Sequence, residues 1–252
     1  MEVDPKKRFA NRGEYYDMYR PNYPKALLRY FLNELAFSPE SVVADIGSGT
    51  GMLSELLLGN GNLVFAVEPN DEMRSIAEAK LSTYRGFKSV NGSAESTTLP
   101  AGSVDLITAA QSFHWFVPDE ARAEFRRILR LNGWVALIWN TRKTSTPFLK
   151  GYEELVDWLR SESKNAVKHE DLSDRVISKF LGKYKVVKLD NSQQLDLKGL
   201  VGRLSSASYS PLPTNPLYGE FVRRARELFE RYQQNGTISL DYWTEVFAGQ
   251  LS

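Results

Sequence analysis

Three glycines at alternate positions, directly after an apolar run, constrain the fold of this chain more than any other sequence feature. The run ends at Ile46, the glycines are Gly47, Gly49 and Gly51, and a helical pattern begins at Met52. A strand, a tight glycine turn and a helix N-terminus in this order form a corner that binds nucleotides. The kind of nucleotide that this corner binds therefore decides the function of the chain.

Short apolar segments alternate with amphipathic helical segments from residue 41 to residue 140. Strands that are apolar on both faces are typical of a parallel sheet covered by helices. We therefore expect an α/β fold with a Rossmann-like, seven-stranded, mostly parallel sheet, helices on both faces and a helical insertion or cap after the fifth strand. The expected strands are Ser41–Ile46, Leu63–Val67, Phe87–Val90, Val104–Ala109, Trp134–Trp139, Tyr184–Leu189 and Thr237–Ala248. The expected helices are Pro24–Phe37, Met52–Leu58, Asn70–Tyr84, Pro118–Leu131, Pro147–Ser163, Asp171–Leu181, Leu197–Ser206 and Leu217–Gln234.

We expect these elements to form four regions of one domain. Residues 1–40 form an N-terminal segment and helix that close over the binding site, and residues 41–140 form the ligand-binding core. Residues 141–183 form the helical insertion or cap over the ligand edge. Residues 184–252 complete the sheet with further strands and helices, among them a polar stretch at 191–196 between a strand and a helix.

Composition excludes several classes of site. The net charge is +1, so no overall basic field attracts a phosphate backbone, which argues against a nucleic-acid partner. The absence of cysteine excludes disulfides, thiolate zinc sites and a cysteine nucleophile, and two histidines disfavour a histidine-rich metal centre. No apolar leader or membrane-spanning run is present, so a cytoplasmic protein without a membrane partner is expected.

The glycine spacing and a preceding acid point away from a dinucleotide. Met52 stands where a dinucleotide-binding loop has its third glycine, and Asp45 lies two residues before Gly47. A carboxylate there repels phosphates and favours a cationic ligand. S-adenosylmethionine (SAM) carries an ammonium and a sulfonium and no phosphate, so we expect Asp45, Gly47, Ser48, Gly49 and Gly51 to contact SAM.

Further contact positions follow the next two strands. Glu68 lies about 20 residues beyond the glycines, where an acid accepts hydrogen bonds from ribose hydroxyls. Pro69 follows it, and Met73 is expected either against adenine or in the core. Ser93, Ala94 and Glu95 follow the third strand, where small residues and a side-chain oxygen suit a planar base; an ordinary Asn-Gly turn is the alternative.

The fourth strand ends in a polar and aromatic segment beside the methionine end of SAM. Gln111 and Ser112 are expected to contact SAM, and His114 is a candidate base or orienting group for the acceptor. The alternative for His114 is a residue that only hydrogen-bonds a neighbour and shapes the pocket. The aromatic candidates for pocket walls are Tyr15, Tyr16, Tyr19, Trp115 and Trp139.

These motifs resemble class I SAM-dependent methyltransferases, and within them the methyltransferase type 11 family. The likeness covers about residues 41–140 and rests on the segments Asp45–Gly51, Glu68, Gly92–Glu95 and Gln111–Phe116. The segments Tyr19–Pro24 and Gln111–Phe116 are also similar to trans-aconitate methyltransferase-like proteins. In that group the N-terminal segment folds over SAM, which implies that Tyr19 and Arg20 hold its carboxylate. Ser93 stands where the family often has Asp, which shifts adenine binding toward Ala94 and Glu95.

The sequence thus predicts an enzyme that moves a methyl group from SAM to a small-molecule acceptor, without a metal. A carboxylate acceptor would use Arg20, Arg142 or Arg203 for its other acid groups, a hypothesis based on charge alone. The alternatives are a methyltransferase that acts on RNA or protein and a non-catalytic SAM-binding partner protein. The arginine-rich helix that includes residues 221–231 has interleaved acids, so a solvated face is favoured over an RNA-binding face. The oligomeric state, monomer or homodimer, stays open.

Overall fold

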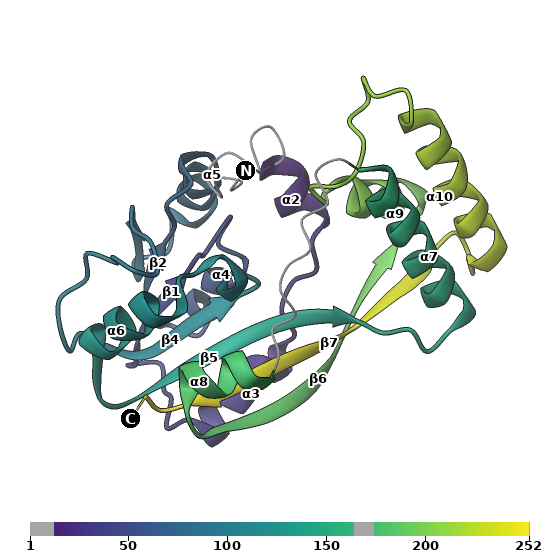
Figure 1. Ribbon diagram of the computed structural model, residues 1–252. Helices are drawn as coiled ribbons and strands as arrows, with labels where there is room; N and C mark the ends of the chain where they lie inside the picture. The colour runs from purple at the N-terminus through teal and green to yellow at the C-terminus, as the bar shows by residue number, and fades with distance from the viewer. Residues whose placement is uncertain (1–12, 164–173, 252) are drawn as a thin grey trace.

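A seven-stranded sheet organises the computed structural model, which describes residues 13–163 and 174–251 (Figure 1). The strands are β1 (Val42–Ile46), β2 (Leu63–Val67), β3 (Phe87–Val90), β4 (Val104–Ala110), β5 (Leu129–Arg142), β6 (Tyr184–Leu195) and β7 (Ile238–Gly249). The helices are α2 (Gly13–Tyr19), α3 (Lys25–Glu34), α4 (Met52–Gly59), α5 (Asp71–Leu81), α6 (Pro118–Ile128), α7 (Pro147–Glu162), α8 (Asp174–Leu181), α9 (Leu197–Ser205) and α10 (Tyr218–Tyr232), with a 3-10 turn η1 (Phe113–Trp115).

The strand order is β3-β2-β1-β4-β5-β7-β6. Strands β1 to β5 pair in parallel, and β7 runs antiparallel to both β5 and β6. The expected seven-stranded, mostly parallel sheet is therefore confirmed. Because parallel strands end at the same edge, the segments after β1, β2, β3 and β4 gather there.

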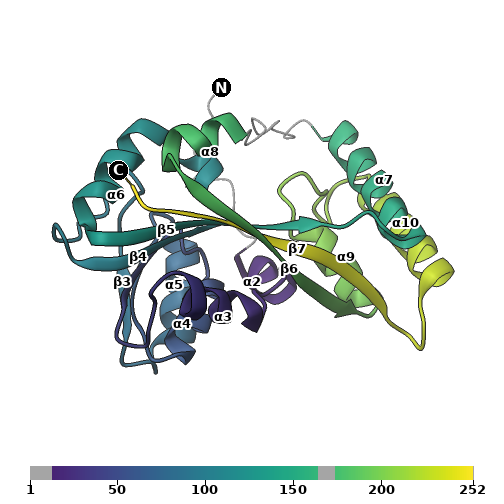
Figure 2. The same ribbon diagram turned by 90° about the horizontal axis from the view of Figure 1, so that it is seen from below.

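Helices cover both faces of the parallel half of the sheet, as Figure 2 shows for α3, α4 and α5 on one face and α6 and α8 on the other. Leu27, Phe31 and Leu57 are buried against β1 and β2 on the first face. Phe125 and Phe180 are buried against the second face. Burying such side chains contributes roughly 2 kcal/mol each, so this double-sided core holds the binding edge in place.

The antiparallel half of the sheet carries a third core under α7, α9 and α10 (Figure 1). Tyr152 on α7, Leu200 on α9, Phe221 on α10 and Tyr242 on β7 are buried in it. Helix α7 contacts α10, whereas α8 contacts α6 and β7. The start of the helix expected at Asp171 lies outside the described residues, and the four-region division of the chain stays a prediction.

Several expected boundaries are wrong, and β5 spans Leu129–Arg142 where a strand at Trp134–Trp139 was expected. Strand β6 continues to Leu195 through the stretch that we expected to be polar connection, because an edge strand paired only with β7 can leave alternate side chains in solvent. Helix α6 ends at Ile128 and not at Leu131, because Leu129 already pairs with Val104 of β4. In the described part of the chain, no helix is both long and apolar enough to cross a membrane.

Candidate functional site

A cavity of about 250 Å³ opens at the carboxyl ends of β1, β2 and β4. Its lining residues come from the glycine turn, the segments after β2, β3 and β4, and the N-terminal segment. They are Tyr16, Tyr23, Asp45, Gly47, Ser48, Gly49, Thr50, Met52, Leu53, Glu68, Pro69, Asn70, Met73, Ser93, Ala94, Glu95, Ala110, Gln111, Ser112, Trp115 and Phe116. Five segments that are distant in sequence thus meet around one cavity.

The glycine turn needs its glycines for two different reasons. Gly47, Gly49 and Gly51 have φ angles of 66°, 57° and 82°, which side chains other than glycine rarely adopt. A Cβ atom on Gly51 would lie 2.5 Å from Leu81 Cδ1, whereas a Cβ atom on Gly49 would meet no atom within 4 Å. Gly51 therefore allows close packing of α4 on α5, and Gly49 leaves open space at the cavity.

Two hydroxyl groups in the same turn lack internal partners. Ser48 Oγ and Thr50 Oγ1 are shielded from solvent and form no hydrogen bond in the structure, although both residues line the cavity. Buried polar groups are nearly always satisfied, so orphaned hydroxyls at a cavity indicate a polar ligand. This fits an adenosyl or amino-acid group held close to the turn.

Asp45 is the most buried acid of the site, with 1% of its surface exposed. Its carboxylate accepts hydrogen bonds from Ser54 Oγ at 2.7 Å and Thr108 Oγ1 at 2.8 Å. Burial raises the pKa of Asp45 to about 6, and the hydrogen bonds from Ser54 and Thr108 oppose this rise. A cationic ligand group at this position would remove the cost of burying the charge.

Glu68 braces the turn from the end of β2. Its Oε2 accepts from the Gly49 amide at 2.9 Å and its Oε1 accepts from the Asn70 amide at 2.8 Å. Burial raises the pKa of this carboxyl, and the two amides oppose the rise. Each carboxylate oxygen retains a lone pair, so the side chain can also accept from ligand hydroxyls. Glu68 is therefore not a freely solvated loop acid.

The segments after β2 and β3 form the next wall. Asn70 caps α5 by accepting from the Met73 amide at 3.1 Å, as expected, and Met73 is buried at the cavity. Glu95 Oε1 accepts from the Val117 amide at 2.8 Å, which ties Ser93–Glu95 to the start of α6. Ser93 and Ala94 line the same wall.

The end of β4 supplies the third wall. Gln111 has a positive φ of 57°, and its side-chain amide donates to the Asn140 carbonyl at 3.3 Å. Ser112 Oγ donates to the Ile46 carbonyl at 2.7 Å, which leaves its oxygen lone pairs toward the cavity. His114 stacks on Trp115 with ring centroids 4.9 Å apart, and Trp115 rather than His114 lines the cavity.

Three expected contact residues do not line the cavity. Tyr19 packs so closely on α9 that a Cβ atom on Gly202 would lie 2.4 Å from its ring. Arg20 donates to the Ser206 carbonyl at 3.3 Å, and Gly51 packs on Leu81. Of the aromatic wall candidates, Tyr16 and Trp115 line the cavity, whereas Tyr15 and Trp139 do not.

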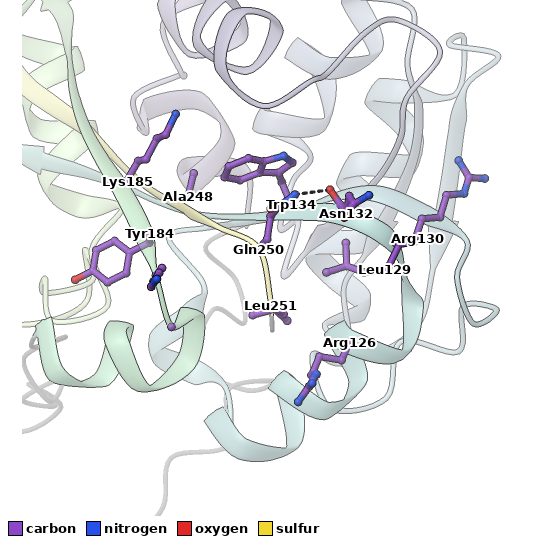
Figure 3. Close-up of a pocket in the computed structure, with 14 residues that line it drawn as sticks. Arg126, Leu129, Arg130, Asn132, Trp134, Tyr184, Lys185, Ala248, Gln250 and Leu251 are labelled. Atoms are coloured by element: carbon purple, nitrogen blue, oxygen red, sulfur yellow. Dashed lines mark hydrogen bonds between the residues drawn. The ribbon is translucent and has the colours of Figure 1, made fainter.

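Several residues that line the cavity were not predicted from the sequence. Met52 and Leu53 begin α4, and their apolar character signalled only a helix core. Tyr23 lies in the segment Tyr19–Pro24 and Thr50 in the glycine turn, so both lie beside residues that were expected to contact the ligand. Figure 3 shows a second, larger hollow of about 1050 Å³ between the starts of β5 and β6 and the end of β7, where none of the expected site residues lies.

Comparison with known proteins agrees with this geometry. Residues 44–137 match the family model of a methyltransferase domain, Methyltransf_11. An uncharacterized methyltransferase-like protein of Schizosaccharomyces pombe is 30% identical over 165 residues, covering 64% of this chain and 62% of that protein. The chain thus spans less than two thirds of the length of this curated relative.

Two solved structures share the fold. A candidate type II methyltransferase from Anaeromyxobacter dehalogenans superposes with a TM-score of 0.70 and 23% identity, covering 92% of this chain and 97% of that chain. A SAM-dependent methyltransferase from Geobacter sulfurreducens, solved with S-adenosyl-L-homocysteine (SAH), has a TM-score of 0.50 and 16% identity over the whole of both chains.

The two glycine environments lead to unequal expected losses of stability on substitution by alanine. Gly51→Ala combines a strained φ with overlap on Leu81 and should cost roughly 2–4 kcal/mol, whereas Gly49→Ala should cost about 1 kcal/mol from backbone strain alone. Urea denaturation of both variants beside the wild-type chain measures this. Equal losses at the two positions would contradict the packing role of Gly51.

Proposed function

We propose that this chain, whose residues 44–137 match a methyltransferase domain, transfers a methyl group from SAM to a small-molecule acceptor. The observation that carries the proposal is the cavity at the strand ends, with a buried acid, a braced glycine turn and two orphaned hydroxyls. Bound SAM would supply a methyl group already activated on a sulfonium.

Each wall of the cavity suits one part of SAM. Asp45 would attract the ammonium, Glu68 would accept from the ribose hydroxyls, and Ala94 and Glu95 would flank adenine beside Met73. The remaining proposed contacts are Gly47, Ser48, Gly49, Pro69, Ser93, Gln111 and Ser112, with Tyr19, Arg20 and Gly51 in indirect positions. We propose that residues 1–40, of which 13–40 are described, close the site.

The reaction needs alignment more than acid–base chemistry. The acceptor atom forms a bond to the methyl carbon while the carbon–sulfur bond breaks, and the electron pair of that bond stays on sulfur to give SAH. Tyr16, Tyr23 and Trp115 would exclude water and hold the acceptor in line with the methyl group. We propose His114, whose ring contacts that of Trp115 at the cavity wall, as an orienting group or base for acceptors that carry a proton.

Two arginines support an acidic acceptor. Arg203 on α9 is 4% exposed, and Arg20 and Arg203 both donate to Ser206. Among the described residues, neither forms a salt bridge, whereas Arg142 pairs with Glu153. Arg20 Nε is also shielded and unpaired. Since unpaired buried charges are costly, an anionic group of the acceptor is the partner that these guanidinium groups fit.

The pair lies beside the donor site. The Arg20 guanidinium carbon is 4.8 Å from the centre of the Tyr16 ring, and Tyr16 lines the cavity. Burial, together with the charge of Arg203, lowers the pKa of Arg20. A carboxylate acceptor with a second acid group could therefore place one group on the arginines and the other toward the methyl group. Of the three arginines considered from sequence, Arg142 is already neutralised.

The alternative acceptors receive less support. On α10, Arg223 bonds to Glu220 and Glu227, and Arg224 bonds to Glu220 and lies over the Trp158 ring at 4.3 Å. Internally paired arginines release few counterions from RNA. A protein acceptor and a non-catalytic role remain the alternatives that a transfer assay separates. The resemblance to trans-aconitate methyltransferase-like proteins stays a prediction.

Titration calorimetry with SAM and SAH tests donor binding. We expect both to bind, and Glu68→Gln to weaken binding about 10- to 100-fold because one charge-assisted acceptor pair to the ribose is lost. The exposed Glu230→Gln is the matched control on α10. Absence of heat with the wild-type chain, or full affinity in Glu68→Gln, would refute the assignment of this cavity.

The raised pKa of Asp45 gives donor binding a pH signature. Near pH 6 about half of the free protein carries a protonated Asp45, and a bound ammonium lowers this pKa, so binding should release protons. Affinity should therefore fall as the pH decreases below 6. Calorimetry at pH 6 in buffers of different ionisation enthalpy measures the release. Asp45→Asn should abolish the release; an undiminished release would assign the proton to another group.

A labelled-methyl transfer screen tests the acceptor class. Small di- and tricarboxylates are compared with their amides, and with phenols and amines, in the wild-type chain and in Arg203→Gln. We expect transfer to acids only, with a 10- to 100-fold rise of KM in Arg203→Gln while SAH affinity is kept. Arg223→Gln is the surface control. Transfer to amides at equal rates would overturn the acidic acceptor, and no transfer to any compound would favour a non-catalytic or macromolecular role.

A further inference from the structure

Residues 19–22, here the strap, connect α2 to α3 beside the cavity. Tyr16 precedes the strap and Tyr23 follows it, and both line the cavity. Helix α2 contacts α5 and α9, and Figure 2 shows it on the face of the sheet that carries α3, α4 and α5. The position of the strap therefore fixes two walls of the site.

Three carboxamide side chains from the long antiparallel strands bind the strap through its backbone. Asn191 Nδ2 donates to the Asn22 carbonyl at 2.7 Å, and Gln193 Nε2 donates to the Tyr19 carbonyl at 3.2 Å, both from β6. Asn140 Nδ2 on β5 reaches the Pro21 carbonyl at 3.4 Å. These three residues form a carboxamide clamp on carbonyl groups that no helix or strand satisfies.

A second layer fixes which way two of the three carboxamides face. Arg203 Nε donates to the Tyr242 hydroxyl at 3.1 Å, so this hydroxyl directs its own proton to Gln193 Oε1 at 2.9 Å. The Gln193 amide nitrogen must then face the strap. Thr244 Oγ1 donates to Asn140 Oδ1 at 2.6 Å, which turns the Asn140 amide nitrogen toward the strap in the same way.

These donors explain polar residues that the sheet itself does not need. Asn191 lies opposite Tyr242 and Asn140 lies opposite Thr244, on neighbouring strands. A polar group on a covered sheet face is destabilising unless it is hydrogen-bonded. Here Gln193 and Asn140 are satisfied by the second layer on one side and by the strap on the other. Asn191 Oδ1 accepts from the Ser192 amide at 3.0 Å, and its Nδ2 donates to the strap and to Asn140 Oδ1.

We propose that Asn140, Asn191 and Gln193 are positioning residues that hold the strap, and with it Tyr16 and Tyr23, in place over the cavity. The proposal rests on the proposed donor site, because its effect is read from ligand release. It assigns a role to β5, β6 and β7, most of which lie outside the matched domain at residues 44–137. The clamp acts through the strap and touches no reacting atom.

Two conservative variants remove strap bonds, and Asn191→Asp also removes the bond from Asn191 Nδ2 to Asn140 Oδ1 at 3.2 Å. Gln193→Glu still accepts from Tyr242 but cannot donate to Tyr19, and Asn191→Asp cannot donate to Asn22. We expect SAH to dissociate about fivefold faster from each variant and roughly 25-fold faster from the double variant, since each neutral hydrogen bond contributes about that factor. Stopped-flow tryptophan fluorescence, with Trp115 at the cavity, measures the release rate.

Hydrogen exchange of residues 16–23 is the second readout. It should quicken in both variants while β1 and β4 stay protected, and the urea midpoint should change little. Thr141→Val is the matched control, because it removes a β5 hydroxyl that donates to Glu245 and leaves the strap bonds and the second layer unchanged. Equal release in the control, or unchanged exchange in the double variant, would overturn the clamp. If the wild-type chain binds no SAH, the donor site fails, and exchange of the strap alone then decides the clamp.

Discussion

The buried carboxylate of Asp45 joins the three elements from which the site is built. It ends β1, accepts from Ser54 on α4 and accepts from Thr108 on β4. Moving its pKa from 3.8 to about 6 corresponds to about 3 kcal/mol of disfavoured ionisation. A chain selected for stability alone would place a neutral residue there. An acid kept at that cost is expected at a functional site, where local rules of stability are broken for binding.

The bracing of the glycine turn follows from the same arrangement. With β1 fixed by Asp45, the amides of Gly47 and Ser48 donate to the Val67 carbonyl of β2, and Glu68 then binds the Gly49 amide. The turn is therefore held by the neighbouring strand and not by its own helix. A ligand arrives at a loop whose shape is already set, which limits the entropy lost on binding.

The sequence predicted this half of the structure well because strand ends and glycine spacing are local signals. Asp45, Glu68, Ser93 and Gln111 follow successive strands, and parallel topology alone brings such positions together. The prediction that Gly51 contacts the ligand illustrates the limit of such local signals. Its spacing resembled a ligand contact, whereas its Cα packs on Leu81, a residue 30 positions away that no local pattern identifies.

The antiparallel half of the sheet was less predictable from the sequence, because its functional residues bond to partners that are distant in sequence. The polar composition of the segment from Asn191 onward is typical of a connection, yet this segment forms the end of β6. Its side-chain amides donate to the backbone carbonyls of Asn22 and Tyr19. Arg20 and Arg203 are separated by most of the chain and meet at Ser206, so charge counting could not distinguish them from Arg142.

The two halves of the sheet contribute different parts of the proposed group-transfer site. Parallel strand ends surround the donor cavity through residues that the family pattern specifies, whereas the long antiparallel strands hold the strap and one of the two unpaired arginines. Tyr242 belongs to both functions, because its hydroxyl accepts from Arg203 and donates to Gln193. A charge bound at Arg203 therefore acts on the same hydrogen-bonded chain that ends at the strap carbonyl of Tyr19. Under the proposed function, acceptor binding and closure over the donor would thus be physically connected through one tyrosine.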